Sequence, residues 1–274
     1  MFRAQRTGLP ESRRLTRQLR HRYRDLRWRL AARGAKVVGE TEPDPQVPEL
    51  AVGAVGMGRK YADWCLTMVT SLRERGEYQG PVYIITDLPE YFAQLSNVRI
   101  IQVPPTSTSY RLIAKSCKQH LMSYVTEAVL VYLDSDLVIT SSFADWYRRM
   151  ASGLSEYPML CYHDNKPCEG AFHGGVVVLD TKRGMPIVHR WQKAVRSGRW
   201  GSDQACLYSV AGADGPGHLP NQGLTFLRTL LRRGEKPECI VHVTNGAIKE
   251  HPSEALLEYL TEELGVTRLP REFG

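Results

Sequence analysis

With 274 residues, of which 42% are hydrophobic and 24% charged, the chain is long enough for one large α/β domain with an appendage. Its formal net charge of +7 comes from residues 1–36, where twelve basic and two acidic residues give +10 and leave −3 for the rest. No stretch approaches the roughly 20 apolar residues of a membrane-spanning helix. We also expect no secretory signal, because no apolar segment follows the first arginines.

The first predicted element is an amphipathic helix in the basic arm, residues 1–36. Apolar residues recur there at helical spacing, with arginines on the other faces: Leu15, Leu19, Tyr23, Leu26 and Leu30. Three prolines between positions 43 and 48 forbid a continuing helix and predict an extended, Pro-rich linker over residues 37–49. The main domain then comprises residues 50–274.

In this domain, strand-like segments alternate with helix-length segments, which predicts crossovers. We therefore expect a single α/β, Rossmann-like domain with a mixed, mainly parallel sheet and helices on both faces. The predicted strands are residues 50–55, 82–87, 98–103, 129–134, 159–162, 175–179 and 239–243. The predicted helices are residues 61–75, 110–125, 186–196, 203–209 and 254–264, the last with Ser253 as its N-cap.

The strand beginning at Val129 brings two carboxylates, Asp134 and Asp136, to its carboxyl end. Its five consecutive apolar residues indicate a buried strand, and ligands of open α/β sheets bind at that edge. With only the small Ser135 between them, both carboxylates can turn toward one hard cation such as Mn²⁺ or Mg²⁺. A bare D-x-D pattern is also compatible with an Asp-rich turn.

Three other patterns follow along the chain. Gly174-Gly175 opens an apolar strand, where glycines either permit close approach of a ligand or backbone or mark a β-bulge. Asp203-Gln204 follows Ser202 at a helix start, a position that favours acidic residues for structural reasons as well. His242 ends the last strand and precedes a loop with a glycine and a lysine, a combination able to complete a metal shell and hold a phosphate. A strand-end histidine is often purely structural.

In this order the motifs resemble nucleotide-sugar glycosyltransferases of the A-type fold. They are most similar to family eight, which includes glycogenin and bacterial lipopolysaccharide galactosyl- and glucosyltransferases. The resemblance covers about residues 50–250: Val131–Asp136 matches the family's Y-L-D-x-D, and Asp203-Gln204 its D-Q. The sequence departs from the family in two places. Phe172–Asp180 resembles the family's F-N-x-G-V-x-x-x-(N/D), but His173 stands where Asn is usual. The family's H-x-x-G-x-x-K ending is one residue longer here, at His242–Lys249.

The resemblance implies a hexosyltransferase that moves a sugar from a nucleotide diphosphate, a UDP-sugar above all, to a hydroxyl of a glycan, lipid-linked or protein acceptor with retention. A divalent metal, Mn²⁺ or alternatively Mg²⁺, would be held by Asp134, Asp136 and His242. It would bridge the two phosphates and stabilise the departing diphosphate together with Lys249. An inverting enzyme would instead need a carboxylate base, for which Asp164 and Asp203 are candidates.

The same resemblance implies which residues contact each substrate. Tyr61 would stack on the base, and Asp87 would accept hydrogen bonds from base or ribose. Arg111 and Lys115 share a helical face that would meet the phosphates or sugar, although a solvated face looks the same. The residues expected on the catalytic side are Asp203, Gln204 and Asp164, with His173 as a neighbour. Those expected to bind the donor are Ala54, Val55, Gly56, Tyr61, Asp87, Arg111, Lys115, Ser135, Gly174, Gly246 and Lys249.

Two other functional classes share some of these features. A sugar-nucleotide nucleotidyltransferase has the same fold class and metal, but residues 56–60 are shorter than its Gly-rich loop and lack the Pro-Lys ending. A non-catalytic module could bind nucleic acid through the arginines of the arm, but the leucine stripe argues against a bare polyelectrolyte tail. The arm could instead lie on an anionic membrane surface, or dock on the acidic main domain or a second copy.

The six cysteines occur without any C-x-x-C spacing, and most stand in apolar contexts. This pattern predicts reduced, buried thiols in a cytoplasmic protein, which could associate with the inner face of a membrane through the arm. Cys161 and Cys168 are the pair that could form a disulfide if the compartment were oxidising.

Overall fold

The fold is seen in a computed structural model that describes residues 35–105, 117–163, 172–197, 202–211, 216–220, 222–243 and 253–271. The predicted helix of the basic arm lies outside these residues. Five cysteines lie within them, and all five are buried free thiols. Cys168, and with it the considered pairing to Cys161, lies outside.

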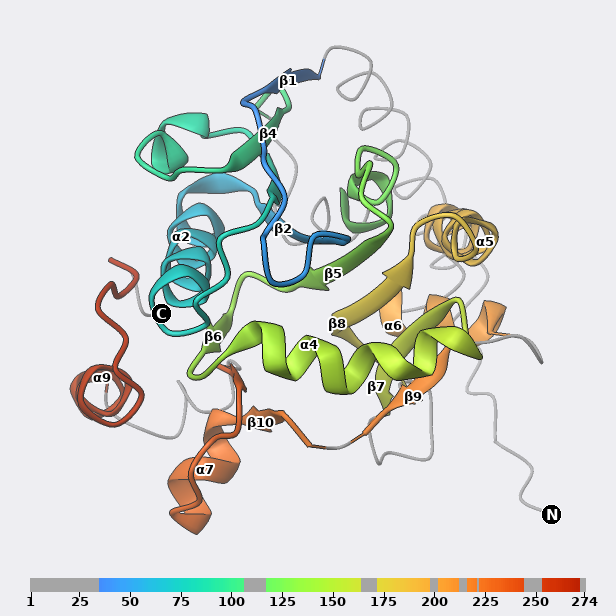
Figure 1. The fold of residues 1–274 in the computed structure, drawn as a ribbon. Helices are drawn as coiled ribbons and strands as arrows, with labels where there is room; N and C mark the ends of the chain where they lie inside the picture. Colours follow the sequence, from blue (N-terminus) through green and yellow to red (C-terminus); the bar gives the residue numbers. More distant parts are fainter. Residues whose placement is uncertain are drawn as a thin grey trace, which may run out of the picture.

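An eight-stranded sheet forms the centre of the molecule, in the order β1-β4-β3-β2-β5-β8-β7-β9 (Figure 1). Strands β4, β3, β2 and β5 are mutually parallel, β8 is antiparallel to β5, and β9 is parallel to β7. This confirms the predicted mixed, mainly parallel sheet. The strands are β1 (Lys36–Val38), β2 (Leu50–Gly56), β3 (Val82–Thr86), β4 (Val98–Gln102), β5 (Val129–Leu133), β7 (Met159–His163), β8 (Phe172–Asp180) and β9 (Gly217–Leu219).

A second, three-stranded sheet has the order β10-β11-β6. Its strands are β10 (Leu224–Phe226), β11 (Ile240–His242) and β6 (Leu137–Ile139). Residues 134–136 form the link from β5 of the large sheet to β6 of the small one. Because β11 is antiparallel to β6, with His242 opposite Leu137, the last strand returns beside the D-x-D segment.

Helices cover both faces of the large sheet (Figure 1). Helices α2 (Gly58–Glu74) and α4 (Phe143–Ala151) pack on one face, and α5 (Met185–Ser197) and α6 (Asp203–Val210) on the other. Helix α7 (Leu227–Arg233) and α9 (Ser253–Glu258), which continues as a π-helical turn (Tyr259–Glu263), pack on the small sheet. Short 3-10 turns occur at Pro89–Phe92 and Ser152–Ser155. Of the predicted helix at 110–125, residues 117–125 are described: 117–121 are helical, but 122–125 are not, because the chain turns there.

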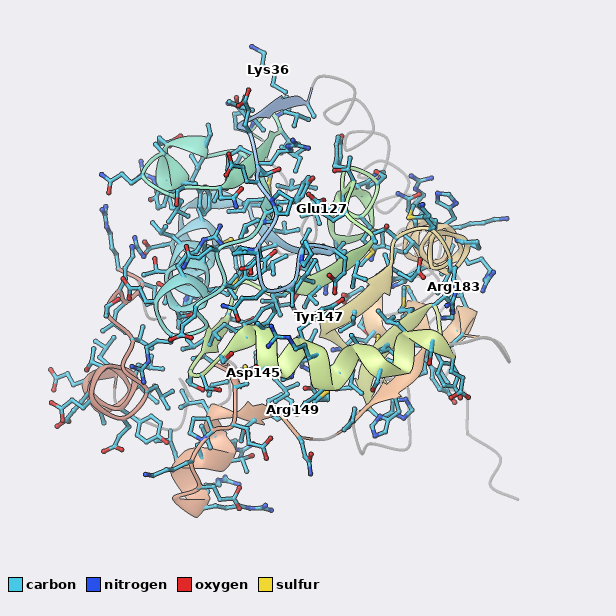
Figure 2. All side chains as sticks on the ribbon, viewed as in Figure 1. Lys36, Glu127, Asp145, Tyr147, Arg149 and Arg183 are labelled. Atoms are coloured by element: carbon cyan, nitrogen blue, oxygen red, sulfur yellow. The ribbon has the colours of Figure 1, made fainter. Side chains whose placement is uncertain are left out.

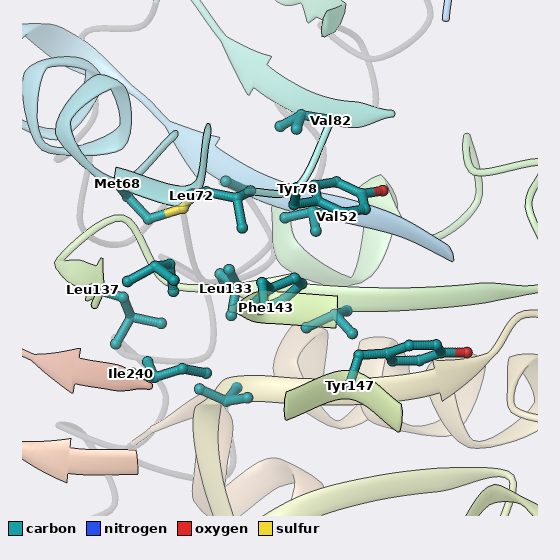
Figure 3. Packing of buried hydrophobic residues seen from close by; sticks show 14 of the residues in the cluster. Val52, Met68, Leu72, Tyr78, Val82, Leu133, Leu137, Phe143, Tyr147 and Ile240 are labelled. Carbon is teal, nitrogen blue, oxygen red and sulfur yellow. The ribbon is translucent and has the colours of Figure 1, made fainter. Parts of the chain in front are cut away.

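The alternation of side chains along the central strands supplies both cores. Figure 3 shows one of them, where Met68 and Leu72 of α2 and Phe143 of α4 pack against Val52 and Leu133 of the sheet. The residues between these on the same strands face the opposite core with α5 and α6. Helix α4, which was not predicted, has Ser142 as its N-cap, and the Ser142 hydroxyl accepts a hydrogen bond from the Asp145 N–H.

The predicted extended linker, residues 37–49, starts as a strand but ends in turns at residues 45–49, and it packs on the domain. Its first residues belong to β1, which pairs with β4, and Asp44 and Val47 are buried. The Asp44 carboxylate accepts hydrogen bonds from the backbone N–H groups of Gln46 and Gln79, both at 2.7 Å. The segment is therefore attached to the main domain at several points.

Many charged side chains are exposed, among them Lys36, Asp145 and Arg183, which are labelled in Figure 2. Within the described part of the chain, none of the helices has the length and apolar character required to cross a bilayer.

Candidate active site

The Asp134-Ser135-Asp136 segment is fixed by its backbone at the junction of the two sheets. The Asp134 N–H donates to the Gly175 carbonyl at 2.8 Å, and the Val243 N–H donates to the Asp136 carbonyl at 2.9 Å. The first bond ties the segment to β8 and the second ties it to the end of β11. Three stretches that are far apart in the sequence therefore meet at the carboxyl end of β5, the edge at which open α/β sheets bind ligands.

Asp136 and His242 form a pair at this junction. Nε2 of His242 lies 3.2 Å from Oδ1 of Asp136. Burial disfavours the charged form of both groups, but the attraction between them prevails, so the pKa of Asp136 is lowered and that of His242 is raised. The fold thus brings together two of the three residues expected as metal ligands, although they are 106 positions apart in the sequence.

His173 extends this pair inward. Its Nε2 lies 3.0 Å from Nδ1 of His242, and Phe226 packs against both imidazole rings, with centroid distances of 5.5 and 5.4 Å. Burial, together with the neighbouring His242, lowers the pKa of His173 to about 3, so its ring is neutral at physiological pH. The other nitrogen, Nδ1, is buried and has no hydrogen-bond partner among the described residues.

Lys118 occupies the centre of a second network. Its ammonium lies 3.0 Å from Oδ1 of Asp134 and 3.2 Å from Oδ2 of Asp203, donates to the Gly174 carbonyl at 2.6 Å, and lies 4.7 Å from the centre of the Tyr132 ring. The Tyr132 hydroxyl also donates to Asp134, at 2.9 Å. Burial alone would lower the pKa of Lys118, but the two carboxylates raise it by more, so its pKa is raised overall and the ammonium stays charged.

Lys118 was not singled out by sequence reasoning, which selected Arg111 and Lys115 instead. A signal was available, because position 118 follows 115 by three and 111 by seven, which places all three on one helical face. The predicted residues Asp164, Arg111, Lys115, Gly246 and Lys249 lie outside the described residues.

The three expected metal ligands, Asp134, Asp136 and His242, are not arranged alike. Among the described residues, no three His, Cys, Asp or Glu side chains converge as a complete metal-binding set, and Asp134 pairs with Lys118 instead. The 3.2 Å between Asp136 and His242 nevertheless suits two adjacent ligands, since bonds of about 2.1 Å at right angles separate their ends by about 3 Å. Such cations commonly take one or two protein ligands and complete their shell with phosphate and water. The donor set fits a cation of this kind.

The predicted nucleotide contacts gather at the neighbouring strand ends. Ala54, Val55 and Gly56 end β2, and β3 runs parallel beside it and leads into Asp87. The buried Asp87 carboxylate accepts a hydrogen bond from the Gly58 N–H at 2.7 Å, at the start of α2. Tyr61, in the first turn of α2, is half-buried. These candidates share a sheet edge with Asp134, because β5 is the other neighbour of β2.

Gly174-Gly175 serves both purposes suggested by its sequence. The pairing of β7 with β8 shifts register here, so that Tyr162 faces His173 while Cys161 faces Val177, which is a bulge-like irregularity. At Gly175, a Cβ would lie 2.7 Å from Cε1 of His173 and 2.9 Å from Oδ2 of Asp134. The missing side chain thus lets both site residues pack directly on the backbone.

Gly175→Ala should therefore disturb both networks at once. We expect a stability loss of about 1–3 kcal/mol from overpacking and weaker nucleotide binding, because His173 and Asp134 must move. Urea denaturation and calorimetric titration with UDP would measure the two effects. Gly234→Ala is the matched control, since nothing lies within 4 Å of a Cβ there; its positive φ of 64° adds backbone strain but leaves the site intact. An alanine at 175 that binds UDP normally would contradict this description.

Comparison with known proteins supports the fold assignment. No family model matches the sequence, and a search of curated proteins finds no match. The structure resembles that of the galactosyltransferase LgtC, solved with donor and acceptor sugar analogs, with a TM-score of 0.60 at 14% identity over 81% of this chain and 98% of LgtC.

Two further structures are similar. The glycosyltransferase GlyE of Streptococcus pneumoniae gives a TM-score of 0.58 at 19% identity over 79% of this chain, which spans only 61% of GlyE. Mouse xyloside xylosyltransferase 1 gives 0.52 at 10% identity, over 72% of this chain and 98% of that protein. The chain therefore has the predicted fold of A-type glycosyltransferases.

Proposed function

We propose that this protein is a metal-dependent glycosyltransferase that moves a hexosyl group from a UDP-sugar to a hydroxyl acceptor with retention. The observation that supports this most is the meeting of Asp136 with His242, and of Asp134 and Asp203 with Lys118, at one sheet edge. This arrangement combines two side chains able to ligate a cation with a buried ammonium, in a fold shared with glycosyltransferases. A departing diphosphate develops negative charge, which a bound cation and a nearby ammonium would stabilise.

Each part of the site then has a distinct task. Asp136 and His242 would hold the cation, which supplies Lewis-acid stabilisation to the leaving diphosphate. The strand ends at Ala54–Gly56 and Asp87 would hold the uridine. Gln204 lies beside Gly174, where its Cγ would be 3.3 Å from an added Cβ, and its amide can hydrogen-bond sugar or acceptor hydroxyls.

The proposal of retention agrees with the state of Asp203, the one of the two candidate bases that lies within the described residues. An inverting transfer needs a base that is ready to take the acceptor proton. Asp203 is instead engaged by the charged Lys118 at 3.2 Å, and its side chain is only 11% exposed. We therefore propose that the leaving phosphate, rather than Asp203, helps to remove the proton. The acceptor would be a glycan, lipid or protein in the cytoplasm, with the basic arm as a membrane or self-association contact.

A donor screen tests the proposed activity. The full chain is incubated with UDP-glucose, UDP-galactose, UDP-xylose and UDP-N-acetylglucosamine, each with Mn²⁺, Mg²⁺ or EDTA, and released UDP is measured. We expect release from one donor with Mn²⁺, less with Mg²⁺ and none with EDTA. Pyrophosphate formation from UTP and a sugar phosphate would identify a nucleotidyltransferase instead. Release that is unaffected by EDTA would rule out the proposed metal.

A further inference from the structure

Asp136, His242 and His173 form a linear series of hydrogen-bonding groups. Nε2 of His242 faces Asp136 at 3.2 Å, and Nδ1 of the same ring faces Nε2 of His173 at 3.0 Å. His173 is 6% exposed and His242 is 9% exposed. The ring of Phe226 lies edge-on to His173 and against His242, which restricts both rings. His242 is therefore held at both nitrogens.

When a cation is bound beside Asp136, the tautomers of His242 and His173 follow from which ring nitrogens must accept and which must donate. A cation beside Asp136 needs the lone pair of His242 Nε2, so the proton of that ring must be on Nδ1. That Nδ1–H can donate only to an acceptor, and the group in reach is Nε2 of His173. His173 must then carry its own proton on Nδ1.

We propose that His173 is a positioning residue, whose Nε2 fixes His242 in the Nδ1–H tautomer so that His242 Nε2 is presented to a divalent cation beside Asp136. Histidine ligands of metals usually donate their second N–H to a carboxylate, carbonyl or water. Here the acceptor of the second N–H is the imidazole of His173, at the position where glycosyltransferase family eight usually has Asn. The inference rests on the cation of the proposed function but not on sugar transfer.

The buried Nδ1 of His173 adds a further reason to assign it a role. Among the described residues this atom has no partner, and an unsatisfied buried polar atom costs about 1–3 kcal/mol. An apolar side chain of similar shape would avoid that cost if His173 only filled space. The hydrogen bond to His242, which an apolar ring could not accept, gives a histidine at this position a function.

The test compares binding of Mn²⁺ alone to the full chain, measured by the electron paramagnetic resonance signal of free Mn²⁺. We expect His173→Phe, which keeps a ring but removes the acceptor, to weaken binding about 10–100-fold. His173→Gln, whose side-chain carbonyl reaches about as far as Nε2 and can accept from His242, should recover most of the loss. His218→Phe, an exposed histidine on β9, is the matched control and should bind as wild type does. Wild-type affinity in His173→Phe would overturn the proposal.

A second measurement needs no variant at position 173. Nitrogen-15 histidine spectra of the wild-type protein with diamagnetic Cd²⁺, assigned with His242→Gln, should show His242 protonated at Nδ1 and metal-bound at Nε2. The opposite tautomer, or no histidine shift with Cd²⁺, would overturn the proposal even if the variants failed to fold. If the tautomer is as expected but no UDP-sugar is turned over, sugar transfer fails while the role of His173 stands.

Discussion

Asp136→Ala should weaken binding of Mn²⁺, and of UDP in the presence of Mn²⁺, by more than the 10–100-fold that follows loss of an outer-shell partner. Asp136 is the carboxylate in contact with His242, and its side chain is 40% exposed, so an incoming cation can reach it. Its removal takes away the anionic half of the proposed ligand pair. Calorimetric titration with UDP, with Mn²⁺ and then with EDTA, would measure the effect.

The matched control is Asp145→Ala, which removes an exposed carboxylate paired with Arg148 at 2.8 Å on α4. It should change neither UDP binding nor the dependence on metal, since exposed pairs contribute little. Asp134→Asn should have a smaller effect on Mn²⁺ affinity than Asp136→Ala, because Asp134 is engaged by Lys118 and Tyr132. Equal UDP affinity in wild type and Asp136→Ala, or in Mn²⁺ and EDTA, would remove the metal from the proposal.

The elements predicted correctly from sequence are those with strong local patterns. Helix α2 was predicted at 61–75 and found at Gly58–Glu74, and β5 was predicted from its five consecutive apolar residues. Strand β6, with three residues, was not predicted. This strand is stabilised by pairing with β11, in which Ile240 lies opposite Ile139, about a hundred positions earlier in the sequence. Local sequence patterns could not predict such a distant partner.

The residues of the candidate site also differ in how well the sequence alone points to them. The D-x-D segment and His242 could be identified because they stand at strand ends, where ligand-binding residues are expected. Lys118 was not selected, because a lysine on a helix normally indicates a solvated face, although its spacing from Arg111 and Lys115 was a signal. Its burial depends on Asp203 and Gly174, 85 and 56 positions away. His173 was recognised as a departure from a family motif, but its contact with His242 required the fold.

Lys118→Met should be the most damaging single substitution in the site. Removing one partner from a buried ionic network costs about 3–5 kcal/mol, because the remaining charges lose their compensation. Here the ammonium is 5% exposed, and its carboxylate partners Asp134 and Asp203 are 30% and 11% exposed. We expect urea denaturation to show this loss at neutral pH, together with loss of UDP-sugar turnover. Lys182→Met, at an exposed lysine, should leave both unchanged.

The dependence of this loss on pH distinguishes a charge effect from a packing effect. Burial already raises the pKa of Asp134 in the presence of Lys118, and without the ammonium it should rise further. A carboxylate with a raised pKa binds more protons in the folded state, so stability falls as pH rises through the interval between its unfolded and folded values. The deficit of Lys118→Met should therefore shrink as the pH is lowered from 7.5 to 5, and the double variant Lys118→Met/Asp203→Asn should recover part of it. A deficit independent of pH would mean that Lys118 acts through packing alone, and the electrostatic account of this network would be wrong.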